Sequence, residues 1–221
     1  MKRRVLVVFP TLWDTRQLAH LPAEVQARHE FVLDEPSDDE VRWDLDVDGW
    51  VAERARRWRG RIDGVFSSSD YPGALAAATL AAELGLPGAP LAAVLACAHK
   101  LTAREIAARV APECTPGFTA VDPEVRASWP GRYPCFVKPV RGSFSIFARR
   151  IASESELAAL FASPALAEYR GYALELFARF ARRAGFTRRP DLFLAEELLG
   201  GVQVTLEGFV RGGREIGRAH V

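Results

Sequence analysis

The chain has 221 residues, of which 49% are hydrophobic and 26% are charged, a composition typical of globular proteins. This length is sufficient for more than one domain. The formal net charge is +1 and basic residues are interleaved with acidic ones, which argues against nucleic acids and anionic membranes as partners.

The first part of the chain alternates apolar runs with amphipathic stretches. Strands are predicted at 4–10, 29–36 and 61–70, and helices at 47–60 and 71–85. Strands that alternate with helices favour a small parallel α/β sheet over the first 90 or so residues. The initial apolar run is short and closed by Pro10, so it indicates a strand and not a signal peptide.

Polar residues follow the third predicted strand, where Ser67–Asp70 precede a helix. Open α/β sheets bind ligands at the carboxyl ends of their strands, which makes these residues candidates for a substrate contact. The alternative is that Ser69 or Asp70 only caps the next helix.

The second part of the chain has a different pattern. Helical stretches are predicted within 89–118, from Ser153 onward and at 172–185, and strands at 133–140, 145–152, 191–199 and 201–210. Because most of these strands follow one another without an intervening helix, we expect an α+β arrangement with an antiparallel sheet.

The cysteines and histidines suggest no disulfide or zinc framework. The cysteines, Cys97, Cys114 and Cys135, are odd in number, far apart and form no CxxC, which fits a reducing cytoplasm. We expect all three to be buried and to pack as small apolar side chains. The four histidines have no metal-ligand spacing.

Lys138 stands at the end of an apolar run and is followed by the loop Arg141–Ser145, which contains Gly142. A buried ammonium group needs an anionic partner, and successive backbone N–H groups in a glycine-containing loop can bind phosphate oxygens. The loop has neither a Walker sequence nor GxGxxG, so an ordinary hairpin turn remains open on spacing alone.

Three segments taken together resemble the nucleotide-binding motifs of the ATP-grasp superfamily. They read, in order, HKLTAREIA (99–107), YPCFVKPVRGSFS (133–145) and FLAEELLGGVQVTLEGFV (193–210). The resemblance implies an α/β N-terminal Rossmann-like pre-ATP-grasp domain over 1–92, followed by an incomplete α+β ATP-grasp domain over 93–215.

The resemblance also implies roles for individual residues. Lys100 and Lys138 would contact the ATP phosphates, with Lys138 also catalytic, and Gly142, Ser143, Phe144 and Ser145 would form the loop that closes over them. Glu196, Glu197, Leu198 and Leu199 would line the adenine pocket, and Gln203 stands where the family usually has the glutamate that holds the ribose. Taken singly, Lys100 could be a solvated helix residue and Glu196–Glu197 a charged strand end.

The function that the resemblance implies is an ATP-dependent carboxylate–amine ligase that works through an acyl phosphate, with ATP and Mg²⁺ as cofactors and a small carboxylate as substrate. We expect a cytoplasmic protein, and a homodimer is the oligomeric state that the resemblance suggests. Two alternatives remain open, a biotin carboxylase-like enzyme and a non-catalytic nucleotide-binding module.

The C-terminal region departs from the family. The magnesium ligands of ATP-grasp enzymes are expected beyond Val221, and residues 216–221 resemble the translation of a sequencing adapter. We therefore expect a truncated chain with a non-native tail over 216–221, inactive by itself.

Overall fold

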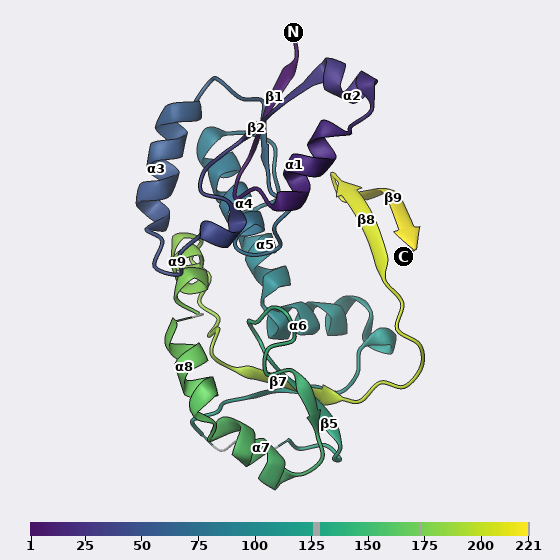
Figure 1. Cartoon of the computed structure of the whole chain (residues 1–221). Coiled ribbons are helices and arrows are strands. Elements are labelled where there is room, and N and C mark those ends of the chain that lie inside the picture. The colour runs from purple at the N-terminus through teal and green to yellow at the C-terminus, as the bar shows by residue number, and fades with distance from the viewer. Residues whose placement is uncertain (126–128, 173, 221) are drawn as a thin grey trace.

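The computed structural model describes residues 1–125, 129–172 and 174–220. Two separate sheets lie toward opposite ends of an elongated molecule, and helices α5 and α6 run between them (Figure 1). The parallel and antiparallel halves expected from the sequence are therefore both present.

The first half contains a three-stranded parallel sheet in the order β2-β1-β3. Its elements are β1 (Arg3–Val7), α1 (Leu12–Ala19), α2 (Ala23–Arg28), β2 (His29–Leu33), η1 (Asp38–Glu40), α3 (Val47–Trp58), β3 (Gly64–Phe66), α4 (Gly73–Leu84) and α5 (Leu91–Ala98). In the register, Val5 on the central strand pairs with Phe31 on one side and Gly64 on the other. Helices α1 and α2 were not predicted.

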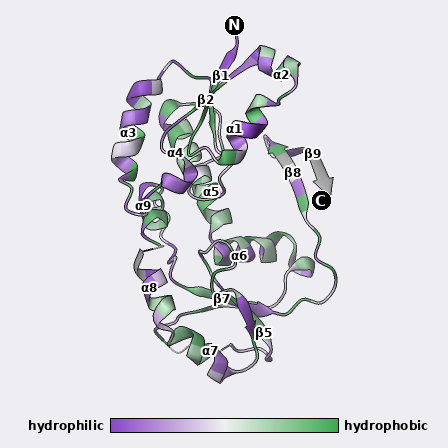
Figure 2. Ribbon diagram, in the orientation of Figure 1, coloured by the Kyte–Doolittle hydropathy of each residue, from purple (hydrophilic) through white to green (hydrophobic). Residues whose placement is uncertain are grey.

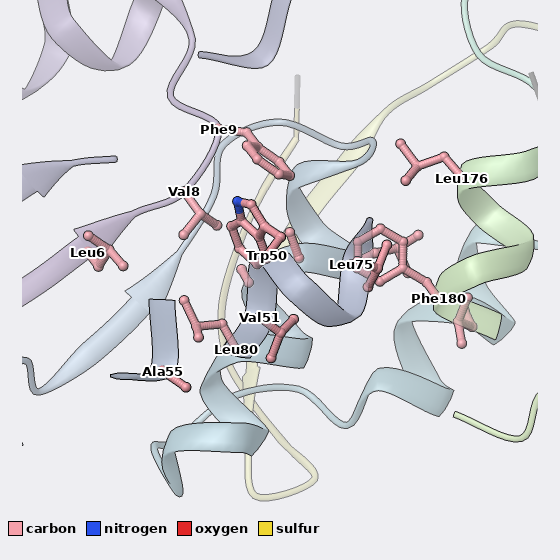
Figure 3. Close-up of a cluster of buried hydrophobic side chains, with 14 of the residues drawn as sticks. Leu6, Val8, Phe9, Trp50, Val51, Ala55, Leu75, Leu80, Leu176 and Phe180 are labelled. Carbon is pink, nitrogen blue, oxygen red and sulfur yellow. The ribbon is translucent and has the colours of Figure 1, made fainter. Parts of the chain in front are cut away.

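The core of this half forms between the sheet, α3 and α4; in Figure 2 helix α4 is largely green, whereas α3, which contributes apolar residues from one face only, is mostly purple. Helix α9, far away in the sequence, completes it: Leu176 and Phe180 reach toward Leu75 of α4 (Figure 3). The arginines of α9 lie on its opposite side, as its predicted apolar stripe implies. A helix from the predicted second domain thus packs in the first core.

The second half contains a four-stranded antiparallel sheet in the order β4-β7-β5-β6. Its elements are α6 (Lys100–Val110), η2 (Pro112–Cys114), β4 (Phe118–Val121), β5 (Cys135–Pro139), β6 (Arg149–Ile151), α7 (Glu154–Phe161), α8 (Pro164–Tyr172), α9 (Glu175–Arg183) and β7 (Phe193–Glu197). The Ser153 hydroxyl caps α7 by accepting a hydrogen bond from the Glu156 amide at 3.2 Å, as predicted.

Side chains alternate across β5. Cys135 and Val137 are fully buried in the core against α7 and α8, whereas Phe136 and Lys138 point to the opposite, half-buried face. Burial of Cys135 agrees with the prediction, but Cys97 and Cys114 are exposed, so the prediction for those two was wrong.

The last two strands, β8 (Leu206–Arg211) and β9 (Arg214–His220), form a hairpin that joins neither sheet (Figure 1). Residues 216–220, expected to be a foreign tail, belong to its second strand. None of the helices in the described part of the chain is both long and apolar enough to span a membrane.

Candidate functional site

A cavity of about 600 Å³ lies between the two halves of the molecule. It is lined by the segment after β3, the junction of α5 and α6, strand β5 and the loop that follows it. The charged residues in its lining are Asp38, Asp70, Lys100, Lys138 and Arg141.

Lys100 enters this cavity because the start of α6 is held in place twice. Its backbone N–H donates to the Val140 carbonyl at 2.8 Å, which ties the helix to the end of β5. Its side-chain Nζ donates to the carbonyl of Gly142 at 2.6 Å. The two predicted lysine segments are therefore joined directly by hydrogen bonds.

His99 fixes the start of α6 from inside the protein. The imidazole is fully buried, and its Nδ1 accepts a hydrogen bond from the Thr102 amide at 3.2 Å, so it serves as the N-cap. Nε2 then carries the proton and donates to the Arg189 carbonyl at 3.0 Å. Burial lowers the pKa of His99, which favours this neutral form.

Burial also affects Lys100. The pKa of Lys100 is lowered to about 8, first by burial and then by the positive charges of Arg141 and Lys138, with Asp70 acting in the opposite direction. An anion that entered the cavity would stabilise the ammonium form of Lys100 and raise its pKa.

Lys138 has the anionic partner that a lysine in this position requires. Glu196 of β7 accepts from Lys138 through Oε1 and from Arg104 Nη2 through Oε2 at 2.7 Å. The Glu196 side chain is only 9% exposed, so its carboxylate lies between two cations in a partly dry environment. One acid balances two bases, which leaves a net positive charge on this group of three side chains.

Arg141 is a third cation in the lining and was given no role from the sequence. It is 5% exposed, and its guanidinium carbon lies 3.7 Å from the ring centroid of Tyr71. No ion pair involves Arg141 within the described residues. A cation–π contact contributes about 2 kcal/mol when desolvated, whereas burying a charge costs several kcal/mol. The contact with Tyr71 therefore offsets only part of the free-energy cost of burying the charge of Arg141.

The loop after β5 has an unusual backbone at the rim of the cavity. Phe144 and Ser145 have φ angles of 53° and 56°, a region that costs non-glycine residues about 1–2 kcal/mol each. The ring of Phe144 is 96% exposed. Backbone hydrogen bonds from the Ile146 amide to the Ser143 carbonyl (3.1 Å) and from the Ala148 amide to the Ser145 carbonyl (3.0 Å) hold the segment in this conformation.

The residues after β3 also face the cavity. Helix α4 has no side-chain cap at its N-terminus, so the prediction that Ser69 or Asp70 caps it was wrong. The Ser69 hydroxyl instead donates to Asp38, and Asp70 is exposed in the cavity lining.

The residues that were predicted to contact adenine are not among the described residues that line the cavity. Glu197 accepts from the Gly117 amide at 2.8 Å, while Leu198 and Leu199 are 40% and 73% exposed. Gln203 is exposed as well. Neither these residues nor Glu196 appear in the described lining of the cavity, and their contact with adenine stays a prediction.

No cluster of three or more His, Cys, Asp or Glu residues suited to a metal occurs in the described ranges. Magnesium in nucleotide sites is usually held by substrate phosphates and one or two carboxylates. The described lining offers cations for a phosphate group together with the carboxylates of Asp38 and Asp70.

A sequence signal for this site lies in the choice of basic residue. The chain contains 29 basic residues, yet lysine occurs only at Lys2, Lys100 and Lys138. Two of these three lysines line one cavity. Arginine and lysine are not interchangeable, and a compact ammonium suits a site where a point charge meets phosphate oxygens.

No protein-family model matches the sequence, and no curated protein matches it. Among solved structures, the chain is similar to an L-amino acid ligase from Bacillus licheniformis, with a TM-score of 0.62 and 17% identity over 99% of this chain and 50% of that one. It is similar to D-alanyl-alanine synthetase A from Vibrio cholerae, with a TM-score of 0.59 and 12% identity over 97% and 64%. A phosphoribosylglycinamide synthetase from Anaerococcus prevotii gives a TM-score of 0.52 and 14% identity over 100% and 51%.

The chain spans about half to two thirds of the length of these solved proteins. At such low identity the likeness concerns the fold, and it extends over nearly the whole of this chain. The chain therefore shares its fold with these solved ligases and synthetases, which agrees with the ATP-grasp resemblance of its three motifs.

Proposed function

We propose that this protein is an ATP-dependent ligase that joins a carboxylate to an amine or another nucleophile. The observation that carries the proposal is the convergence of Lys100, Lys138 and the loop 142–145 on one cavity, within a fold shared with solved ligases. Composition alone would not distinguish this chain from many other globular proteins.

The triphosphate is assigned to the two lysines. Lys100 Nζ donates to the carbonyl oxygen of Gly142, and a phosphate oxygen is a stronger acceptor for the same ammonium. Lys138 shares Glu196 with Arg104, so the group of three side chains retains one positive charge for a phosphate. The loop residues Ser143–Ser145 supply backbone N–H groups and would rearrange over the bound nucleotide.

The reaction assigned to this site has two steps. A carboxylate oxygen of the substrate attacks the γ-phosphorus of ATP, the bond from that phosphorus to the β–γ bridging oxygen breaks, and ADP leaves. The nucleophile then attacks the carbonyl carbon of the acyl phosphate, the bond from that carbon to the phosphate oxygen breaks, inorganic phosphate leaves, and the nucleophile loses its proton to phosphate or water. In both steps the protein contributes position and positive charge, and no nucleophilic side chain is required.

Because the chain contains only three lysines, each of them can be replaced and its effect on ATP binding measured separately. We expect Lys100→Met and Lys138→Met each to weaken ATP binding by roughly 10-fold or more, because each removes a charge-assisted hydrogen bond to phosphate. Lys2→Met, the remaining lysine, is exposed and is the matched control. Isothermal titration with ATP, with circular dichroism to verify folding, gives the answer.

Unchanged ATP affinity in both folded variants would remove the lysines from the nucleotide site. Inorganic triphosphate should compete with ATP, since the assigned contacts are to phosphate. Binding of ATP that triphosphate does not displace would place the nucleotide elsewhere.

A further inference from the structure

A second, smaller cavity adjoins the first and shares part of its lining. It has a volume of about 150 Å³, and its walls include the aromatic side chains Trp43, Tyr71 and Tyr169. Arg141 and the loop 142–144 line both cavities. An apolar cavity of about 150 Å³ is large enough to hold a benzene-sized group.

The walls of this smaller cavity are held together by specific contacts. The rings of Trp43 and Tyr71 are stacked, with centroids 6.2 Å apart and planes at 26°. The Tyr169 hydroxyl donates to the Arg141 carbonyl at 2.9 Å, which fixes the start of the loop against this wall. The space is therefore shaped by packed rings, with one cation in its lining.

Arg141 sets the chemistry of the shared wall. The residue is 5% exposed, its guanidinium lies over the ring of Tyr71, and its Nη2 lies 3.4 Å from the Ser143 hydroxyl. The hydroxyl of Tyr71 is buried and has no hydrogen-bond partner of ordinary geometry among the described residues. A planar guanidinium fork matches a planar carboxylate in two parallel hydrogen bonds.

The charges divide between the cavities. Lys100 and Lys138 line only the larger one, where the triphosphate is assigned, whereas Arg141 reaches both. A ligand with its anionic group on Arg141 and an apolar group among the rings would have its anion beside the phosphate site. This is the place that the carboxylate to be activated must occupy.

We propose that Arg141 binds the carboxylate of the acid substrate, and that the cavity of Trp43, Tyr71 and Tyr169 selects acids that carry a flat, ring-sized apolar group. This assignment rests on the proposed function, because it names the substrate class for the same site. The site thereby prefers an aryl or similarly bulky apolar acid over a short or polar one.

The test uses the whole chain and three probes, phenylacetate, its neutral amide phenylacetamide, and acetate, measured by isothermal titration. Phenylacetate should bind at least about 10-fold more tightly than either of the other two, since each of those lacks one of the two recognised groups. Arg141→Met should reduce phenylacetate affinity roughly 10- to 100-fold, and Arg141→Lys should restore only part of it.

Arg61 is exposed and forms no ion pair with any residue that the structure describes, so it provides the control Arg61→Met, which should bind like wild type. Trp43→Ala, at a half-exposed position, tests the ring wall if Arg141→Met does not fold, and should weaken phenylacetate but leave acetate unchanged. Equal binding of acid and amide, unchanged binding in folded Arg141 variants, or stronger binding of inorganic phosphate than of phenylacetate at Arg141 would each overturn the proposal.

The result also separates the two proposals. ATP affinity in the Lys100 and Lys138 variants tests the nucleotide site, and phenylacetate binding without nucleotide tests the acid site. If phenylacetate binds but ATP does not, only the ligase function is refuted. If ATP binds but phenylacetate does not bind selectively, either alone or in the presence of a non-hydrolysable ATP analogue, only the acid site is refuted.

Discussion

Replacing Glu196 by glutamine tests the charge arrangement beneath the cavity. The carboxylate is 9% exposed and lies between Lys138 and Arg104, whose side chains are 20% and 23% exposed. Glu196→Gln keeps the size and one acceptor oxygen but removes the only negative charge of the group. Two partly buried cations are then left without their anion.

The magnitude follows from this geometry. Breaking a buried ion pair by removing one partner costs about 3–5 kcal/mol. Here both cations keep some contact with water, and glutamine still accepts one hydrogen bond, so we expect the free energy of unfolding to fall by about 2–3 kcal/mol. Urea unfolding followed by far-ultraviolet circular dichroism at neutral pH measures this difference.

Two further variants make the result specific. Glu24→Gln changes an exposed glutamate that has no ion pair in the described part of the chain, and it should alter stability by less than about 0.5 kcal/mol. In the double variant Lys138→Met/Glu196→Gln, part of the loss should be recovered, because one of the unpaired cations is gone. A loss for Glu196→Gln no larger than that for Glu24→Gln would show that the carboxylate does not stabilise the fold through these cations.

Three other predictions concern neighbouring residues. Because burial lowers the pKa of His99 below 6.5, the unfolded chain takes up a proton at a higher pH than the folded protein does. The free energy of unfolding should therefore fall as the pH drops through 6.5, and His99→Asn should remove this fall. Urea unfolding between about pH 5 and 8 measures it, and an unchanged pH profile in the variant would refute the reasoning. With a pKa of about 8, Lys100 should react with acetic anhydride faster than Lys2 at that pH. Inorganic triphosphate should slow the labelling of Lys100, which peptide mass spectrometry measures. Equal labelling rates for Lys100 and Lys2 would contradict the burial of Lys100. A Cβ at Gly73 would lie 2.0 Å from Ser67 Oγ, so Gly73→Ala should cost about 1–3 kcal/mol in urea unfolding, and no measurable loss would show that Ser67 can move aside.

The local pattern of the chain was sufficient for many of its elements. The continuous apolar run of β1, the capping serine of α7 and the apolar stripe of α9 each depend on neighbours within a few residues, so they can be read from the sequence. Helices α1 and α2 escaped prediction, since α1 buries little of its surface and α2 has no buried residue. Such helices lack the periodic apolar face on which sequence reasoning depends.

In the candidate site, too, some features could be predicted from the sequence and others could not. The lysines and the glycine–serine loop could be named from three motifs, because the spacing of such motifs is a local property of the chain. The pairing of Lys138 with Glu196 arises from the antiparallel pairing of β5 with β7, in which Phe136 lies opposite Glu196. The spacing of residues along the sequence does not indicate which residues of β5 and β7 lie opposite one another.

The sequence by itself thus determined the order of the parallel and antiparallel halves, which follows from local apolar periodicity, and it contained three motifs whose resemblance to a known superfamily implied the fold and singled out the two lysines. Only the tertiary structure decided that Lys100 and Lys138 meet in one cavity, that α9 crosses over to the first core, and that Arg141 is buried against Tyr71. These are contacts between segments distant along the chain, and they are set by which surfaces pack together to exclude water.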